Sequence, residues 1–265
     1  PLFGGSETKP GDLKKLIADE LGVDVETIYG TDLYLYNRME PSIWGANEEF
    51  ISCPQLDDLQ CAYTSLQGFL KGANKQSINV FACFDNEEVG SGTKQGAGST
   101  FLYDAMRRIN NALGKGEEEY YRALASSFML SADNAHAVHP NHPAKTDVNN
   151  CVYMNEGIVV KSHAGQKYTS DAVSIAVFKG LCKKAGVPVQ FFSNRSDTAG
   201  GSTLGNIAMA QVSMNSVDIG LPQLAMHSSY ETAGVKDTAY MIKVMEEFFN
   251  SHIEEMSGHI LKVTK

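Results

Sequence analysis

Hydrophobic side chains recur at helical spacing in several stretches of the chain. In residues 11–21, the apolar positions would share one face of a helix, and Gly22 follows as a stop signal. The same spacing predicts further helices at residues 58–73, 99–113, 115–125, 170–185 and 238–256. A helix of small residues is also expected after the glycine-rich loop at residues 197–205.

Short apolar runs predict strands between these helices. Residues 78–84 are bounded by polar residues and have the composition of a strand that is buried on both faces. Other predicted strands lie at residues 25–36, 127–132, 152–163, 187–192, 217–219 and 224–226, and a loop is expected at 40–50. Strands that alternate with helices predict an α/β fold with a mixed, largely parallel sheet flanked by helices.

Composition and charge narrow the classes of function. The chain has 265 residues, of which 43% are hydrophobic and 20% charged, as in an ordinary globular protein. Its net charge of −9 argues against nucleic acid or an anionic membrane as partner, and no apolar run approaches the about 18 residues of a membrane span. The five cysteines form no Cys-x-x-Cys pair, so we expect a reducing, cytoplasmic environment.

Acidic residues and one histidine fall at the ends of predicted strands. Glu87 and Glu88 follow the run at residues 78–84, Asp133 follows the next strand, and His227 follows the strand at 224–226. Ligand chemistry gathers at the carboxyl ends of parallel strands. Carboxylates and imidazoles bind zinc, and a two-metal site needs a shared carboxylate and a separate base. Taken singly, each residue could instead be a helix cap, a solvated charge or a hydrogen-bonded histidine.

Four motifs occur in a characteristic order along the chain. They are Leu56-Asp57-Asp58-Leu59, Asp85-Asn86-Glu87-Glu88-Val89-Gly90-Ser91, Ser131-Ala132-Asp133-Asn134-Ala135-His136-Ala137-Val138-His139-Pro140 and Met226-His227-Ser228. Together these motifs resemble the aspartyl aminopeptidase family. The members of this family are cytosolic, co-catalytic zinc aminopeptidases. The resemblance covers residues 43–253 and implies a three-layer zinc-peptidase core. It also implies two divalent metal ions, zinc or alternatively manganese or cobalt, a peptide substrate and a homo-oligomer when full length.

The resemblance implies a role for each of seven residues. Asp57 corresponds to the carboxylate shared by both metals, and Glu87 to the general base. The other metal ligands would be Glu88, Asp133 and His227. The substrate contacts would be His136 and Lys161.

One motif of the family has no counterpart. The family has a His-x-Asp motif upstream of the shared aspartate, but none of the seven histidines here is followed two residues later by Asp, and none precedes Asp57. We therefore expect this sequence to be the C-terminal part of a longer enzyme. Residues 1–42 would be a remnant of an inserted dimerisation domain, and residues 43–265 the main part of the catalytic domain. Alone, the chain should bind one metal weakly and have little activity.

The predicted function is release of an N-terminal residue, Asp or Glu, from peptides by attack of metal-activated water. One alternative is a broad or neutral-residue aminopeptidase or a deacylase on the same core. Another is an inactive fragment or scaffold that lacks one metal ligand. A nucleotide-binding role for the glycine-rich residues 90–98 fails, because their spacing matches neither the phosphate-binding nor the dinucleotide-binding pattern.

Overall fold

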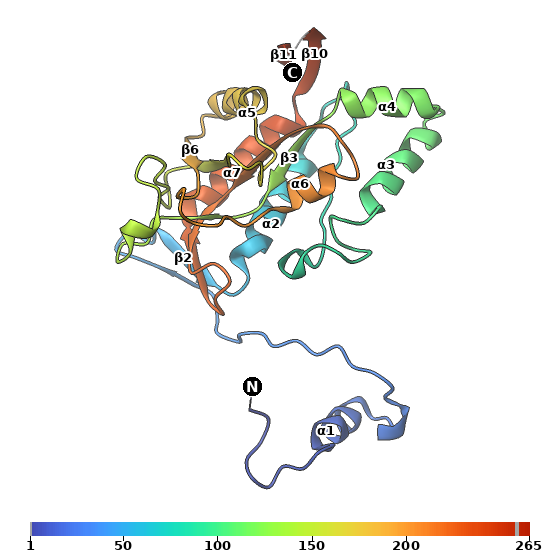
Figure 1. Ribbon diagram of the computed structural model, residues 1–265, viewed down its shortest axis with the longest axis vertical. Coiled ribbons are helices and arrows are strands. Elements are labelled where there is room, and N and C mark those ends of the chain that lie inside the picture. Colours follow the sequence, from blue (N-terminus) through green and yellow to red (C-terminus); the bar gives the residue numbers. More distant parts are fainter. Residues whose placement is uncertain (1, 258–259) are drawn as a thin grey trace. The chain divides into compact units, whose positions relative to one another are not determined.

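The computed structural model describes residues 2–257 and 260–265, which form two compact units divided after Asn37. The first unit contains the helix α1 (Asp12–Leu21), ended by Gly22 in the left-handed conformation, and a short 3-10 helix η1 (Val25–Thr27) (Figure 1). The predicted helix at residues 11–21 is therefore confirmed. The predicted strands at residues 25–36 are wrong, because the described residues there form no strand and leave most of their large apolar side chains exposed.

A four-stranded mixed sheet lies at the centre of the second unit. Its order is β3 (Phe128–Ala132), β7 (Asn215–Gly220), β5 (Ile158–Lys161) and β6 (Val189–Phe192). The outer pairs β3–β7 and β5–β6 are parallel, and the central pair β5–β7 is antiparallel. The strands expected at residues 127–132, 152–163, 187–192 and 217–219 are confirmed, and so is the mixed α/β class.

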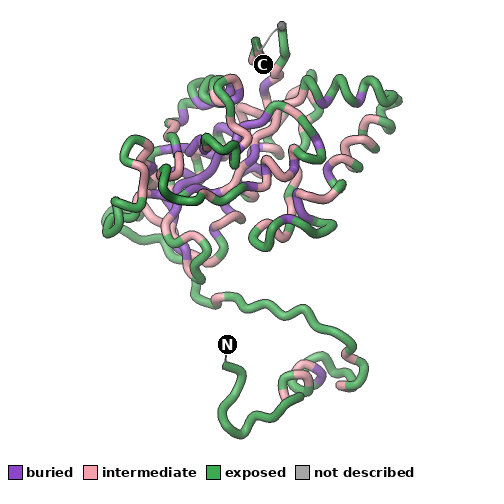
Figure 2. The backbone as a smooth tube through the Cα atoms, in the orientation of Figure 1, coloured by how far each residue is buried: buried purple, intermediate pink, exposed green. Residues whose placement is uncertain are grey.

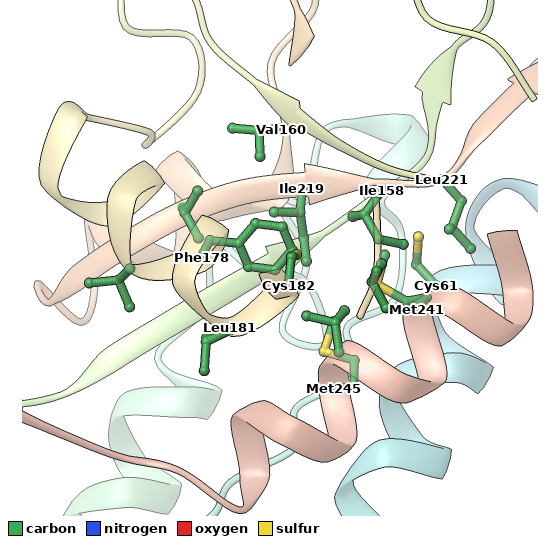
Figure 3. Close-up of a cluster of buried hydrophobic side chains, with 14 of the residues drawn as sticks. Cys61, Ile158, Val160, Phe178, Leu181, Cys182, Ile219, Leu221, Met241 and Met245 are labelled. Carbon is green, nitrogen blue, oxygen red and sulfur yellow. The ribbon is translucent and has the colours of Figure 1, made fainter. Parts of the chain in front are cut away.

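Both faces of this sheet are covered. The helices α2 (Leu56–Lys71), α5 (Ala172–Ala185) and α7 (Val235–Phe249) enclose the main core against one face, where Ile158 and Val160 point (Figure 3). The neighbouring Val159 points to the opposite face, as alternation along a strand requires. On that face α6 (Leu204–Met209) packs closely, because a Cβ at Gly205 would touch the Ser131 and Asp218 side chains. Figure 2 shows the buried residues gathered in these layers.

A second sheet, mostly antiparallel, was not expected. It has five strands in the order β1 (Ser42–Trp44), β2 (Phe50–Cys53), β9 (Glu231–Gly234), β8 (Pro222–Leu224) and β4 (Ala135–His136), of which only β4 and β8 are parallel. The predicted loop at residues 40–50 is therefore wrong over β1. The sheet brings together the chain just before α2, the loop after β8 and the residues that follow β3.

The remaining elements are smaller and bear on two predictions. The helices α3 (Phe101–Ala112) and α4 (Glu117–Ala125), expected from the sequence, pack around Tyr120, and η2 (Glu87–Val89) and η3 (Pro143–Lys145) are single 3-10 turns. The predicted helix at residues 238–256 is too long. It ends at Phe249, where the Asn250 side chain donates to the carbonyl of Glu246 and accepts from Ala73. The chain then continues as β10 (His252–Ser257), which pairs with β11 (Ile260–Thr264).

The predicted buried strand at residues 78–84 is wrong in this structure. This stretch is not a strand, and Ile78 and Val80 are exposed. The predicted strand at residues 127–132 does form, as β3, but most of its residues are only half-buried. Within the part of the chain that the structure describes, no helix is long and apolar enough to cross a membrane.

Candidate metal centre

Three predicted metal ligands meet at one point. Asp57 lies in the first turn of α2, Glu88 in η2 and His227 in the loop after β8. The Nε2 atom of His227 is 3.1 Å from Asp57 Oδ2 and 3.1 Å from Glu88 Oε2. The Asp57 side chain is 4% exposed, whereas those of Glu88 and His227 face solvent. Two carboxylates and an imidazole at this spacing form an open three-ligand site of the kind that binds catalytic zinc.

A buried glutamate that the sequence analysis missed holds this site in place. Glu231, in β9, is 2% exposed, and its two carboxylate oxygens accept hydrogen bonds from two backbone amides. The N–H of Asp57 donates to Oε2 at 2.9 Å, and the N–H of His227 donates to Oε1 at 2.7 Å. His227 has a φ of 66°, which costs energy in any residue but glycine, so the hydrogen bond helps to hold an unfavourable backbone conformation.

Asp57 also belongs to a second group of carboxylates. Oxygen atoms of Asp57, Asp58 and Asp133 lie within 4.8 Å of one another, close enough to bind one cation. Asp58 was not assigned a role from the sequence, although it stands next to Asp57. The Oδ1 atoms of both aspartates are buried and have no hydrogen-bond partner. Because buried polar atoms normally have a partner, these two oxygens are suited to bind a cation.

The electrostatics of these carboxylates also favour a bound cation. Burial raises the pKa of Asp57 to about 8, and the nearby charges of Asp133 and Glu88 add to the effect. Burial and the charge of Asp133 also raise the pKa of Asp58 well above its ordinary value. Such crowding of carboxylates is unfavourable unless positive charge compensates it. Divalent cations would supply that charge, so the residues present fit two bound metal ions.

Lys161 supplies positive charge within the protein itself. Its Nζ atom donates to Asp133 Oδ2 and to the carbonyl oxygen of Asn134, both at 2.8 Å. Burial lowers the pKa of this lysine, but the charge of Asp133 and the hydrogen bond to it outweigh that effect, so the pKa is raised. The Lys161 side chain is only 3% exposed. Its contacts therefore give it a structural role beside Asp133, and its predicted contact with substrate stays a prediction.

Asn134 connects this group to the start of α2. Its side-chain amide donates to the carbonyl of Leu56 at 3.0 Å and to Oε1 of Gln223 at 2.8 Å. The residue is 2% exposed. It follows Asp133 directly, so the network fixes the end of β3 against α2, whose first turn contains Asp57 and Asp58. Sequence alone could not reveal this role, because Asn134 acts through the Leu56 backbone.

Glu87 and His136, the predicted base and one predicted substrate contact, lie outside the two ligand groups. Glu87 is half-buried in η2, beside Glu88, and lines the same cavity as Asp57 and Asp133. Burial raises its pKa, and the charges of Asp133 and Glu88 raise it further. His136 lies in β4, three residues after Asp133, and is exposed, with its ring 6.4 Å from that of Phe192. A half-buried carboxylate beside the cluster and an exposed imidazole are compatible with the predicted roles, which stay predictions.

Comparisons with known proteins place this chain in a family. Residues 5–249 match the family model described as aminopeptidase I zinc metalloprotease (M18). The "Probable M18 family aminopeptidase 2" of Clostridium acetobutylicum is 49% identical over 242 residues, which cover 91% of this chain and 56% of that protein. The chain therefore spans little more than half the length of this relative.

The fold of the chain is also similar to solved structures. A chain in a cryo-EM structure of the Ape4 and Nbr1 complex is 34% identical and superposes with a TM-score of 0.81, covering 94% of this chain and 50% of that one. A chain of the S. cerevisiae mApe1 dodecamer is 27% identical with a TM-score of 0.76, covering 94% of this chain and 59% of that one. These likenesses extend over nearly all of the chain.

Proposed function

The chain belongs to the aminopeptidase I zinc metalloprotease (M18) family, and from this premise we propose that it carries the catalytic centre of a metal-dependent aminopeptidase. Its substrates would be peptides with an acidic residue, Asp or Glu, at the N-terminus. The observation that supports this most strongly is the position of Asp57. Its carboxylate belongs to both ligand groups, as a residue shared by two cations must.

The metal ligands divide into two sets around that shared residue. Glu88 and His227 would complete one site, and Asp58 and Asp133 would contribute to the other. The donors are oxygen and nitrogen atoms, which suit zinc and also manganese or cobalt. Bound divalent cations would supply Lewis-acid chemistry, activating water and polarising a carbonyl group.

Glu87 would move the proton in this reaction. Its pKa is raised by burial and by the charges of Asp133 and Glu88, which makes it a stronger base than an ordinary glutamate. It would accept a proton from the attacking water and later donate it to the amine of the leaving peptide. Glu231 and Asn134 would take no part in proton transfer and would orient the ligand-bearing backbone.

His136 is the residue we propose for contact with an acidic substrate side chain. It is exposed and lies three residues after Asp133. Desolvation and the charge of Lys161 lower the pKa of this histidine, so its imidazole would contact a substrate carboxylate as a neutral N–H donor. Lys161 is less accessible, although its charge adds to the positive potential on this side of the cluster. A preference for acidic residues would arise from these two groups.

The test is a panel of Asp, Glu and Leu anilides and acyl-amino acids, assayed with the chain, saturating Zn²⁺ and a chelator control. Because one ligand expected from the family resemblance is missing, the rate of the chain alone should be low, so metal dependence and selectivity are the diagnostic quantities. We expect Asp and Glu substrates to be cleaved fastest and His136→Ala to reduce this preference. Faster cleavage of Leu anilide or of acyl-amino acids would support the alternatives. No metal-dependent rate on any substrate would support an inactive fragment.

We also propose that the protein is a cytoplasmic homo-oligomer in which residues 1–42 take part in association. The five cysteines form no Cys-x-x-Cys pair, a pattern that suits a reducing compartment. The stretch that leads into β1 exposes several large apolar side chains, which are Tyr29, Leu33, Tyr34, Leu35 and Tyr36. Contiguous exposed apolar residues of this kind commonly mark interaction sites. Sedimentation of the chain with and without residues 1–42 would test this assignment.

A further inference from the structure

Asp218 is a buried carboxylate that lies outside the two groups of metal ligands. It is in β7 and is fully buried. Its Oδ1 atom accepts hydrogen bonds from the hydroxyl groups of Ser131 at 2.5 Å and Thr203 at 2.8 Å. Its Oδ2 atom accepts from the hydroxyl group of Thr169 at 2.9 Å and from the backbone N–H of the same residue. A buried carboxylate is costly without such donors, and here they surround both oxygens.

These donors come from three separate parts of the chain. Ser131 lies in β3. Thr169 lies in residues 162–171, which join β5 to α5, and Thr203 lies in residues 193–203, which join β6 to α6. We call these two connections the double loop. A single carboxylate therefore ties both halves of the double loop to the central sheet.

The two halves of the double loop also pack against each other. The hydroxyl groups of Ser162 and Ser193 lie 3.1 Å apart. A Cβ atom at Gly200 would come within 3.1 Å of His163 Nε2, so the backbone of one half lies against a side chain of the other. Asp218 therefore anchors two segments that contact each other.

The double loop lies beside the residues that we propose to surround the substrate. The Nζ atom of Lys161 lies 5.6 Å from the centre of the Tyr168 ring. The ring of Phe192 is 6.5 Å from that of Tyr168 and 6.4 Å from that of His136. The proposed metal ligands all lie outside the double loop. A displacement of the double loop would therefore disturb the surroundings of the substrate more than the metal centre.

We propose that Asp218 is a positioning residue that fixes the double loop as one wall of the substrate site. It would contact neither metal nor substrate, because its carboxylate is fully buried and already accepts from four donors. Its effect would be on the binding of the substrate side chain rather than on the chemical step. This inference rests on the proposed aminopeptidase function, and its test includes a measurement that needs no activity.

The kinetic test compares Asp218→Ala with the unsubstituted chain, both with all 265 residues, with saturating Zn²⁺ and below their melting temperatures. Rates on Asp and Leu anilides give kcat and KM. We expect KM for the Asp anilide to rise by about 10-fold or more, because the binding groups are misplaced, and kcat to change by less than about 3-fold. The preference for Asp over Leu should fall. A loss of folded protein would instead lower kcat and leave KM unchanged.

Amide hydrogen exchange of the metal-free chain tests the anchoring without catalysis. In Asp218→Ala, exchange in the double loop should become faster by about 10-fold or more, because the segments open more often when the carboxylate is lost. Exchange in α2 and α7 should stay unchanged, which would show that the variant remains folded.

Asp218→Asn is the conservative variant that should rescue both measurements. Its amide oxygen can accept from Thr169. Its amide nitrogen can donate to the hydroxyl groups of Ser131 and Thr203, because a hydroxyl group accepts as well as donates. We expect KM to stay within about 3-fold of the value for the unsubstituted chain. Rescue would show that hydrogen bonds, and not the negative charge, hold the double loop.

A pair of threonine variants tests one of the hydrogen bonds by itself. Thr203→Val removes a single donor and keeps the branched shape of the side chain, so it should raise KM by a smaller factor than Asp218→Ala. Thr198→Val is the matched control, because Thr198 lies in the same half of the double loop but is exposed. That variant should leave KM unchanged.

Three results would overturn the inference. The first is an unchanged KM in Asp218→Ala, whether or not kcat falls. The second is unchanged hydrogen exchange in the double loop of that variant. The third is an Asp218→Asn variant that is as impaired as Asp218→Ala, because the charge would then matter rather than the hydrogen bonds. If the unsubstituted chain had no metal-dependent rate, the proposed function would fail, and with it the substrate role inferred for Asp218.

Discussion

Asp57 and His227 donate their backbone N–H groups to the two oxygens of one buried carboxylate, that of Glu231, at 2.9 and 2.7 Å. The two residues come from distant parts of the sequence, and β9 fixes both with a single side chain. Their own side chains then meet 3.1 Å apart. The spacing of the ligand pair is therefore set by one residue that would not contact the metal.

Glu231→Gln should weaken divalent-metal binding. The glutamine amide nitrogen cannot accept a hydrogen bond, so either the Asp57 or the His227 amide would lose its partner. Loss of such supporting contacts costs about 10- to 100-fold in metal affinity. Competition of the chain with a chromophoric zinc chelator measures this change. The exposed Glu255→Gln serves as the control, and equal affinities for both variants would show that Glu231 does not position the ligands.

The metal-free chain should become less stable as the pH rises from about 4 to about 8. The pKa of Asp57 is about 8 in the folded chain and about 3.9 in an unfolded chain. Between these values the folded state retains a proton that the unfolded state has lost, so the free energy of unfolding falls with pH. Asp237, whose pKa burial raises to about 7, contributes with the same sign.

Thermal unfolding with a chelator at about pH 5 and about pH 8 tests this dependence. Asp57→Asn should flatten it in part, and the remaining slope would reflect groups such as Asp237. Saturating Zn²⁺ should reduce the difference for the wild-type chain, because the metal would bind the deprotonated carboxylate. A melting temperature that rises with pH in the chelator, or a slope that Asp57→Asn leaves unchanged, would refute this explanation.

Asp133→Asn should destabilise the metal-free chain by about 3–5 kcal/mol, because it leaves the buried charge of Lys161 without its partner. The double variant Asp133→Asn with Lys161→Met should recover most of this loss, since the unpaired charge is then gone as well. Denaturant unfolding of the two variants and of Lys161→Met alone completes a double-mutant cycle. If the stability losses of the two single variants simply add up in the double variant, the 2.8 Å contact between Lys161 and Asp133 contributes no coupling energy.

Gly68→Ala should destabilise the chain by about 1–3 kcal/mol through overpacking. Gly68 lies in α2, and a Cβ there would come within 2.7 Å of the backbone carbon of Met245 in α7. Because Asp57 and Asp58 lie in the first turn of α2, the same change should also weaken metal binding. Gly180→Ala in α5 is the matched control, since its Cβ would meet nothing within 4 Å. That substitution should instead stabilise the chain by about 0.5–1 kcal/mol. If both variants changed the free energy of unfolding in the same direction, the close approach of α2 and α7 would be contradicted.

Much of the site could be predicted because its residues act through their own side chains. Asp57, Glu88 and His227 come together as expected from the motifs, and Asp133 lies beside Asp57. The argument from strand ends holds only for Asp133 after β3, because residues 78–84 form no strand and β8 ends at Leu224 rather than at residue 226. Glu231 and Asn134 were missed because they act on the backbone of other residues, which leaves no local pattern. The nearest signals were the position of Glu231 four residues after His227 and that of Asn134 next to Asp133.

The secondary structure could likewise be predicted from the sequence only in part. The helix at residues 170–185 carries its own boundaries, because Asp171 caps its start and Gly186 its end. The strand at residues 78–84 was predicted from composition alone, but a strand also requires a neighbour with which to pair, and none is present among the described residues. The helix expected to continue to residue 256 ends at Phe249, because Asn250 forms hydrogen bonds that interrupt it.

The central claim is that Asp57 anchors a divalent-metal centre, and Zn²⁺ titration of the purified chain by calorimetry tests it most directly. We predict saturable binding that Asp57→Asn abolishes and that Glu87→Gln retains, since Glu87 is assigned to proton transfer and lies outside both ligand groups. Binding that Asp57→Asn leaves unchanged, or that Glu87→Gln removes while Glu88→Gln does not, would contradict the account.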